Sequence, residues 1–162
     1  MALIFYAYVK GQKQGDIKGD CRQKGREGAI VCSAFESSCE APHDVQSGLP
    51  TGKRRYKAIK IVKDMDQASP MIWAALTTNE NLSNVTFKFW RPSPKGVEEQ
   101  FYTIKLTNAR VAGATIRQLN MHEMEYAKIP MEEEVSFTFQ KIEWENHTDK
   151  KMASDDWEAP GA

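Results

Sequence analysis

The amino-acid sequence predicts a mainly β domain with one helix, folded as a barrel or a sandwich. Several runs alternate apolar and polar residues, which is the pattern of strands with one buried face. Only one stretch has a convincing helix start, where Ser69 and Pro70 precede the apolar sequence MIWAAL. Strands and helices do not alternate along the chain, so a parallel α/β sheet is not expected.

Seven runs are predicted as strands, and most are rich in β-branched or aromatic residues. They are residues 3–10, 29–35, 55–62, 82–91, 100–108, 111–119 and 135–145. The alternation is clearest in the fourth run, because Val85, Phe87 and Phe89 share one face of a strand. The runs 82–91 and 100–108 are separated by a proline-rich turn and are therefore expected to form a hairpin.

Two of these runs contain an expected irregularity. Residues 111–119 can continue the preceding strand across a bend near Ala109. In residues 135–145 the apolar positions change phase after Phe139, and either a bulge near residues 140–141 or a shift from core to interface along one strand would account for the change.

The helix and the loops are predicted from their end signals. Ser69 is expected to cap the helix and Pro70 to occupy its first position, since proline lacks the N–H that would be unpaired there. The helix is expected to fade over residues 77–81. Residues 120–131 could form a short helix or a loop, and Pro130 with the acidic residues after it favours the loop.

The composition is that of one folded domain. The 162 residues suffice for one hydrophobic core. We expect a single domain over residues 1–150 and a polar C-terminal tail over 151–162. The 22 basic and 22 acidic residues balance, so no net charge attracts nucleic acid or an anionic membrane. The apolar runs are too short to span a membrane, and the first residues do not predict a signal peptide.

The sequence contains no motif that predicts a catalytic or cofactor-binding site. The sequence lacks the nucleophile elbow, the P-loop, the HExxH zinc motif and the dinucleotide-binding glycines. His43, His122 and His147 lie apart in polar segments and are expected to be solvated. No catalytic residue, metal ligand or cofactor is therefore predicted. Three cysteines without a CxxC pair, expected as buried or half-buried thiols in a reducing compartment, are Cys21, Cys32 and Cys39.

Two features call for a binding or assembly role. The loop at residues 44–53 is long, polar and rich in glycine, and such loops commonly bind partners. Several strands also carry small or polar residues opposite their apolar face. Such a face can be simply solvated, or it can be offered to a lumen or a partner. The residues concerned are Ser33, Thr103, Thr107, Ser136 and Thr138.

The order and spacing of several segments resemble the haemolysin-coregulated protein (Hcp) family, which forms the tube of the bacterial type VI secretion system. The segments are GQKQGDI, QSGLPTGKRRYKAIKI, DMDQASPMIWAAL, VTFKFWRP with EEQFYTIKLTNARV, and the closing FQKIEWEN and DDWEAP. Together they cover nearly the whole chain. The resemblance implies two packed antiparallel sheets forming a barrel-like domain, with one short flanking α-helix and a long extended loop.

The resemblance also implies a structural role rather than an enzymatic one. Six copies would form a ring, rings would stack into a tube, and small effectors would be carried and protected in the lumen. The implied partners are further copies of the chain, the sheath, spike and baseplate components, and effector cargo, with no nucleic acid, membrane or cofactor. The chain would be cytoplasmic before firing and then secreted through the type VI system without a cleaved signal peptide.

The resemblance further indicates which residues contact other copies. The long loop would make ring or stacking contacts through Val45, Gln46, Ser47, Gly48, Leu49, Pro50, Thr51, Gly52 and Lys53. Ser33 and Thr115 are small or polar strand residues that would face the lumen.

Two other classes of function compete with this interpretation. A monomeric β-sandwich binding module would recognise a glycan or a peptide without tube assembly, through the loop and through exposed aromatic residues such as Trp90 and Trp157. A small hydrolase would need a pair of carboxylates with acid and base roles. The acidic runs at 132–134 and 155–156 could supply them, but runs of like charge are more often solvated.

Overall fold

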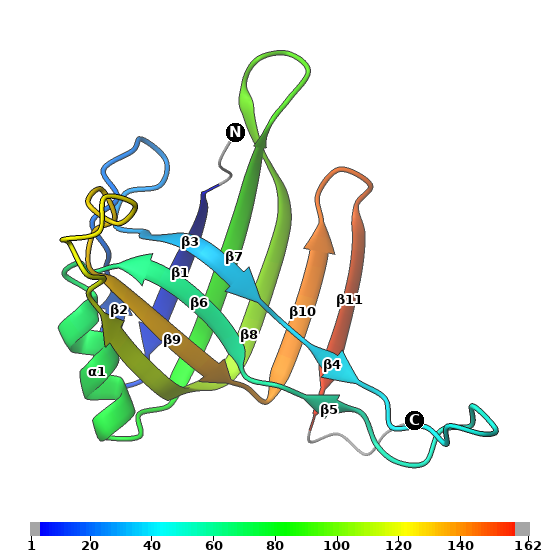
Figure 1. The fold of residues 1–162 in the computed structure, drawn as a ribbon. Coiled ribbons are helices and arrows are strands. Elements are labelled where there is room, and N and C mark those ends of the chain that lie inside the picture. Colours follow the sequence, from blue (N-terminus) through cyan, green and yellow to red (C-terminus); the bar gives the residue numbers. More distant parts are fainter. Residues whose placement is uncertain (1–3, 158–162) are drawn as a thin grey trace.

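A computed structural model describes residues 4–157, which form eleven strands and one nine-residue helix (Figure 1). The strands are β1 (Phe5–Gly11), β2 (Gly15–Ile17), β3 (Ile30–Glu36), β4 (Cys39–Glu40), β5 (Arg55–Tyr56), β6 (Ile59–Asp64), β7 (Leu82–Pro92), β8 (Glu98–Arg117), β9 (Glu132–Thr138), β10 (Lys141–Asn146) and β11 (Lys151–Asp156). The helix is α1 (Ser69–Thr77). The prediction of a mainly β fold with one short flanking helix is confirmed.

Six of the strands close into a barrel. Their order is β8–β7–β1–β3–β6–β9, and β9 pairs with β8 again to complete the circle. All of these pairings are antiparallel. Each of the six strands therefore pairs with two neighbours of the barrel, which leaves fewer open edges than an open sheet would have.

Strand β8 is the strand at which the barrel closes, and its two halves pair with different neighbours. Its first half pairs with β7 and β10, and its second half pairs with β9. Between the halves Asn108 has a positive φ of 51°, a conformation that asparagine tolerates better than most residues. The register also shifts between Val111 and Gly113. The two runs predicted on either side of Ala109 are therefore a single strand of 20 residues.

The prediction of one strand over residues 135–145 is wrong. The chain leaves β9 at Phe139, and the amide of Gln140 donates to the carbonyl oxygens of Thr107 and Asn108 before β10 begins. β9 pairs with β6 and the second half of β8, whereas β10 pairs with the first half of β8 and with β11. The phase change after Phe139 was predicted at the right position, but it marks a change of partner strand and not an irregularity within one strand.

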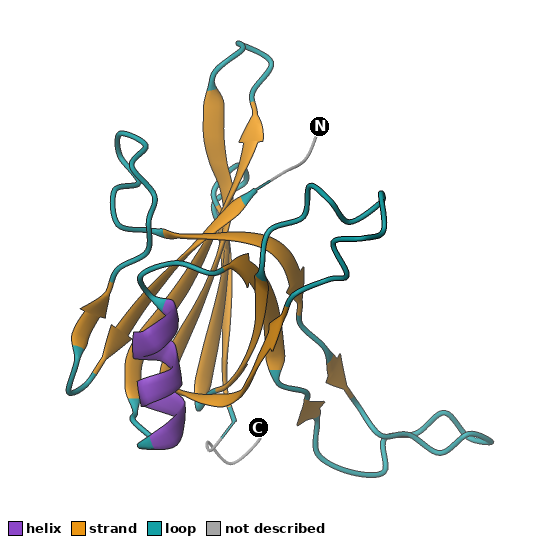
Figure 2. Ribbon diagram, turned by 60° about the vertical axis from the view of Figure 1, so that its left-hand side comes forward, coloured by secondary structure: helices purple, strands orange, loops and turns teal. Residues whose placement is uncertain are grey.

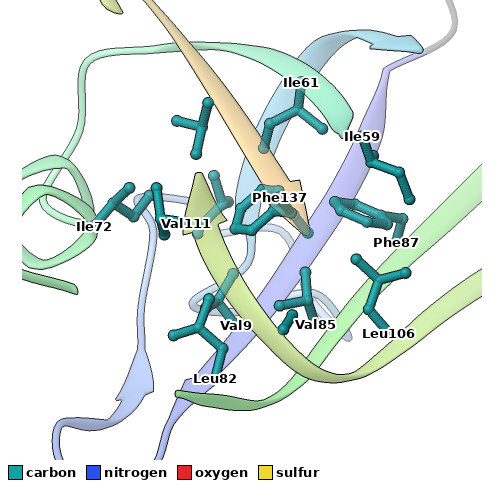
Figure 3. Close-up of a cluster of buried hydrophobic side chains, with 14 of the residues drawn as sticks. Val9, Ile59, Ile61, Ile72, Leu82, Val85, Phe87, Leu106, Val111 and Phe137 are labelled. Atoms are coloured by element: carbon teal, nitrogen blue, oxygen red, sulfur yellow. The ribbon is translucent and has the colours of Figure 1, made fainter. Parts of the chain in front are cut away.

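The inward-facing side chains form one hydrophobic core (Figure 3). Phe87 of β7, Phe137 of β9 and Ile59 of β6 have no exposed surface. Ile72 of α1 is also buried, so the helix adds its apolar side to the same core. Burying each side chain of this size contributes roughly 1.5–3 kcal/mol, which makes the barrel interior the main source of stability.

The start of α1 differs from the prediction. Ala68, not Ser69, is the N-cap residue, and it makes no side-chain capping bond. The carboxylate of Asp66 accepts the amide of Ala68 at 3.0 Å instead. Ser69 is the first helical residue and Pro70 the second, where a missing N–H is still tolerated. The Ser69 hydroxyl is used elsewhere, because it accepts a hydrogen bond from Lys63 at 2.9 Å.

A buried ionic network joins α1 to the barrel. The ammonium of Lys63, which is fully buried, lies 2.8 Å from a carboxylate oxygen of Asp66 and 2.9 Å from one of Glu133. Glu133 is itself fully buried and accepts the indole N–H of Trp73 at 2.6 Å. β6, β9 and α1 are thus tied together by charged groups that have little access to water.

Glu80, just after the helix, holds the turn between β1 and β2. One carboxylate oxygen accepts the amides of Lys13 and Gln14 at 2.7 and 2.9 Å, and the other accepts the Gln14 side chain at 2.7 Å. Burial alone would raise the pKa of Glu80, but these hydrogen bonds bring it below its ordinary value. A Cβ atom at Gly11 would lie 2.7 Å from the Glu80 carboxylate, so glycine leaves room for it.

Candidate assembly surface

The long loop forms an arm that projects from the barrel, on the side away from α1 (Figure 1, Figure 2). We call residues 39–56 the arm. Its base is the two-stranded ribbon of β4 and β5, paired through Cys39 with Tyr56 and Glu40 with Arg55. The run predicted as one strand over 55–62 is therefore two strands, since β5 belongs to the arm and β6 to the barrel.

Hydrogen bonds within the arm give its tip a defined shape. His43 and Pro50 form an isolated β-bridge, and the amide of Asp44 donates to the carbonyl of Leu49 at 2.8 Å. The Asp44 carboxylate accepts the amides of Gln46 and Ser47 at 2.7 and 2.9 Å. These backbone hydrogen bonds hold the pKa of Asp44 below its ordinary value. The arm is a closed, hydrogen-bonded turn rather than an unstructured loop.

The arm exposes apolar surface. All nine residues predicted as the assembly loop, Val45 to Lys53, are exposed. Two of them are large and apolar: Val45 is 93% exposed and Leu49 is 65% exposed. A hydrogen-bonded projection that carries exposed apolar side chains is a surface suited to contact with another protein.

The base of the arm is attached to β11. Arg54 donates from Nε and Nη2 to the two carboxylate oxygens of Asp155, at 2.5 and 2.7 Å. The Tyr56 hydroxyl donates to the same carboxylate at 2.5 Å. These hydrogen bonds hold the pKa of Asp155 below its ordinary value. Burial and the Asp155 carboxylate raise the pKa of Tyr56. We call Arg54, Tyr56 and Asp155 the clamp.

Ser33 and Thr115, the two residues predicted to face a lumen, lie on the same outer face of the barrel. Both are exposed. The register shift between Cys32 and Ala34 makes Ser33 an extra residue of β3, and both Ser33 and Ala34 are exposed. Pairing runs from Ala34 to Val62, then to Glu134 and finally to Thr115, so Ser33 and Thr115 lie on the same outer face with β6 and β9 between them.

The two tryptophans proposed for a binding module do not both present a free ring face to a ligand. The guanidinium of Arg26 lies 3.8 Å from the centre of the Trp90 ring, and Arg26 also donates to Glu98 at 2.6 Å. One face of Trp90 is therefore covered by the chain itself. Trp157 is 41% exposed and packs edge-on against Tyr56 at 5.5 Å. Trp157 therefore packs against the base of the arm.

The histidines do not form a common site. His43 and His122 are exposed, as expected. His147 is half-buried, and its Nε2 lies 2.7 Å from the Thr103 hydroxyl. Within residues 4–157 no group of His, Cys, Asp and Glu could hold a metal ion.

All three cysteines are free thiols, and they differ in exposure. Cys32 is buried, and burial raises the pKa of its thiol. Cys21 is half-buried, whereas Cys39 is exposed, unlike the expectation for these residues.

The acidic runs are used for structure. Glu133 pairs with Lys63 in the interior, and Asp155 pairs with Arg54 in the clamp, so neither run is simply solvated. An open cavity of about 480 Å³ is lined mainly by carboxamides and by Arg110, without a carboxylate. The carboxamides belong to Gln12, Asn81, Asn108 and Gln140.

Across residues 4–157, no helix has the length and apolar character to cross a membrane. The described strands form a closed barrel, and its most prominent exposed feature is the hydrogen-bonded arm. Its sequence matches the profile of a family described as "Type VI secretion system effector, Hcp" over residues 6–146. The chain belongs to this Hcp family, and the expectation drawn from the sequence is confirmed.

Individual relatives agree with the family assignment. The "Major exported protein" of Pseudomonas aeruginosa is 34% identical, over all of this chain and 99% of its own length. A crystal structure of an Hcp protein superposes with a TM-score of 0.90 at 26% identity, covering 98% of this chain and all of the other. The Hcp1 protein of Escherichia coli EAEC 042 superposes with a TM-score of 0.84 at 28% identity, covering 96% and 99% of the two chains.

Proposed function

We propose that the chain is a structural subunit of the type VI secretion inner tube. Six copies form a ring, rings stack into a tube, and the tube carries and protects small effectors in its lumen. Family membership makes it a type VI secretion protein. The observation that carries the proposed assembly is the arm, which holds exposed Val45 and Leu49 in a hydrogen-bonded turn away from the barrel.

The shape of the arm supports a role in assembly on energetic grounds. Association must offset the entropy lost when flexible segments become ordered. The hydrogen bonds around Asp44 already order the tip, so less conformational entropy remains to be lost when it meets another copy. Covering Val45 and Leu49 would remove apolar surface from water, which favours association.

The remaining roles follow from the same proposal. The outer face that carries Ser33 and Thr115 lines the lumen and meets the effectors. The sheath, spike and baseplate components are the other partners. The protein has no catalytic role of its own. It assembles in the cytoplasm and leaves the cell through the type VI system.

The first test is the mass of the purified chain in solution, by size-exclusion chromatography with light scattering. Six chains of 18.4 kDa correspond to about 110 kDa for a closed ring. We expect this mass for the native chain, and ring-shaped particles by negative-stain electron microscopy. A monomer at every concentration would contradict self-assembly of the isolated chain.

The second test changes the arm alone. The double variant Val45→Asp and Leu49→Asp places two charges where assembly would bury apolar side chains, so ring formation or ring stacking should weaken. Met124→Asp is the matched control, because Met124 is 94% exposed and lies in the separate loop at 118–131. All variants should keep the native circular dichroism spectrum, which shows that the barrel still folds. Native assembly by the double variant would show that the arm is not a contact.

A further inference from the structure

The arm extends beyond the barrel as a ribbon of only two strands. Strands β3 and β6 pair as far as Glu36 and Lys60, and the amide of Lys57 then donates to the carbonyl of Ser38 before β4 and β5 continue the ribbon. Beyond the barrel, β4 and β5 pair only with each other among the described residues. A two-stranded ribbon is marginal by itself and bends readily. Backbone pairing alone therefore leaves the direction of the arm weakly defined.

The clamp supplies the missing constraint. The Arg54 guanidinium donates to both carboxylate oxygens of Asp155 and also to the backbone carbonyl of Asp156, at 2.9 Å. Tyr56 donates to the same carboxylate at 2.5 Å. Bidentate, charge-assisted bonds of this kind fix both distance and angle. The side chains of Arg54 and Asp155 are only 28% and 25% exposed, so water competes for them less than at an open surface.

The Asp155 side of the clamp is held firmly by the sheet. Asp155 lies on β11, which pairs with β10 over its full length, and β10 pairs in turn with β8 of the barrel. The aromatic rings of Tyr56 and Phe139 pack at 5.1 Å beside the clamp. The second ion pair at the base, Lys57 with Glu40, has side chains 64% and 62% exposed and joins only the two sides of the ribbon.

We propose that Asp155 is a positioning residue that fixes the direction in which the arm leaves the barrel. The C-terminal strand thereby belongs to the assembly apparatus, although it lies apart from the arm tip. The consequence for assembly rests on the proposed function. The direction of the arm is a property of the single chain and can be measured without assembly.

The test measures a distance across the clamp. Nitroxide labels are attached through ketone-bearing amino acids at Val45, on the arm tip, and at Lys10, an exposed residue of β1. The distribution of distances between the two labels is measured by pulsed electron paramagnetic resonance on dilute protein. We expect a narrow distribution in the otherwise native chain. Asp155→Ala should broaden it, because the arm is then held only by the flexible ribbon, the Arg54 bond to the Asp156 carbonyl and the packing of Tyr56 on Phe139.

Two further variants make the test specific. Arg54→Met opens the clamp from the arm side and leaves β11 unchanged, which covers the case in which Asp155→Ala disturbs that strand. Asp149→Ala removes the same charge from the exposed turn between β10 and β11 and should keep the narrow distribution. Unchanged distributions in both clamp variants would overturn the proposal.

The mass of the assembled protein separates this proposal from the one on which it rests. Broad distributions together with a lost or weakened ring would support both. Broad distributions with unchanged rings would support the positioning role of Asp155 and overturn the role of the arm in assembly.

Discussion

Removing the buried cation tests the ionic network between α1 and the barrel. Lys63→Met keeps most of the side-chain volume but leaves Glu133 and Asp66 without their shared partner. Glu133 is fully buried and would keep only its hydrogen bond from Trp73. Breaking a buried ion pair in this way costs about 3–5 kcal/mol, because the charge that remains is uncompensated. We expect a loss of this size in the free energy of unfolding.

Urea denaturation followed by circular dichroism measures this loss, and Lys60→Met is the matched control. Lys60 lies on the same strand with its side chain on the exposed face, so its replacement should change stability by no more than about 0.5 kcal/mol. Replacing both Lys63 and Glu133 by methionine should recover part of the loss, since an apolar pair needs no counterion. Equal stability of Lys63→Met and Lys60→Met would refute the energetic account of the network.

Three further outcomes are expected. The lowered pKa of Glu80 stabilises the folded state fully above the ordinary glutamate pKa of roughly 4.3, and this stabilisation is lost as the pH falls through the lower pKa of the folded state. In Glu80→Gln the free energy of unfolding should therefore fall less steeply with decreasing pH. Gly19→Ala should destabilise the chain by roughly 1–3 kcal/mol in urea, because its Cβ would lie 2.4 Å from the carbonyl oxygen of Ala29; an unchanged midpoint would contradict this close approach. Trp144 is only half-buried against the core, so Trp144→Ala should cost roughly 1–3 kcal/mol, less than a fully buried tryptophan, and a larger loss in the same assay would contradict its placement.

Much of the barrel could be predicted because alternation reports which face of a strand is buried. Val85 and Phe87 are buried at successive inward positions of β7. Alternation does not identify the partner strand, however. The phase change after Phe139 was visible in the sequence, but only the pairing of β9 and β10 with different halves of β8 explains it.

The candidate surface was predictable in part. The glycines and Pro50 indicated a loop at 44–53, but the hydrogen bonds of Asp44 that shape it depend on three-dimensional closeness. The clamp had no sequence signal, since Arg54 and Asp155 stand far apart and each is an ordinary charged residue. Asp155 was read as part of a polar tail, whereas it lies on β11.

Strand order also determines how the chain must fold. Neighbouring strands of the barrel join residues distant in sequence, Phe5 with Phe89 and Ile59 with Phe137. Each such pairing closes a long segment of chain before its contacts can stabilise it, and proteins dominated by pairings of this kind fold in roughly milliseconds to seconds. Until β9 pairs with both β6 and β8, two apolar strand edges remain open to other chains. Formation of these long-range pairings is therefore expected to be the slow part of folding, and chains whose strand edges are still open are expected to be the most prone to aggregate.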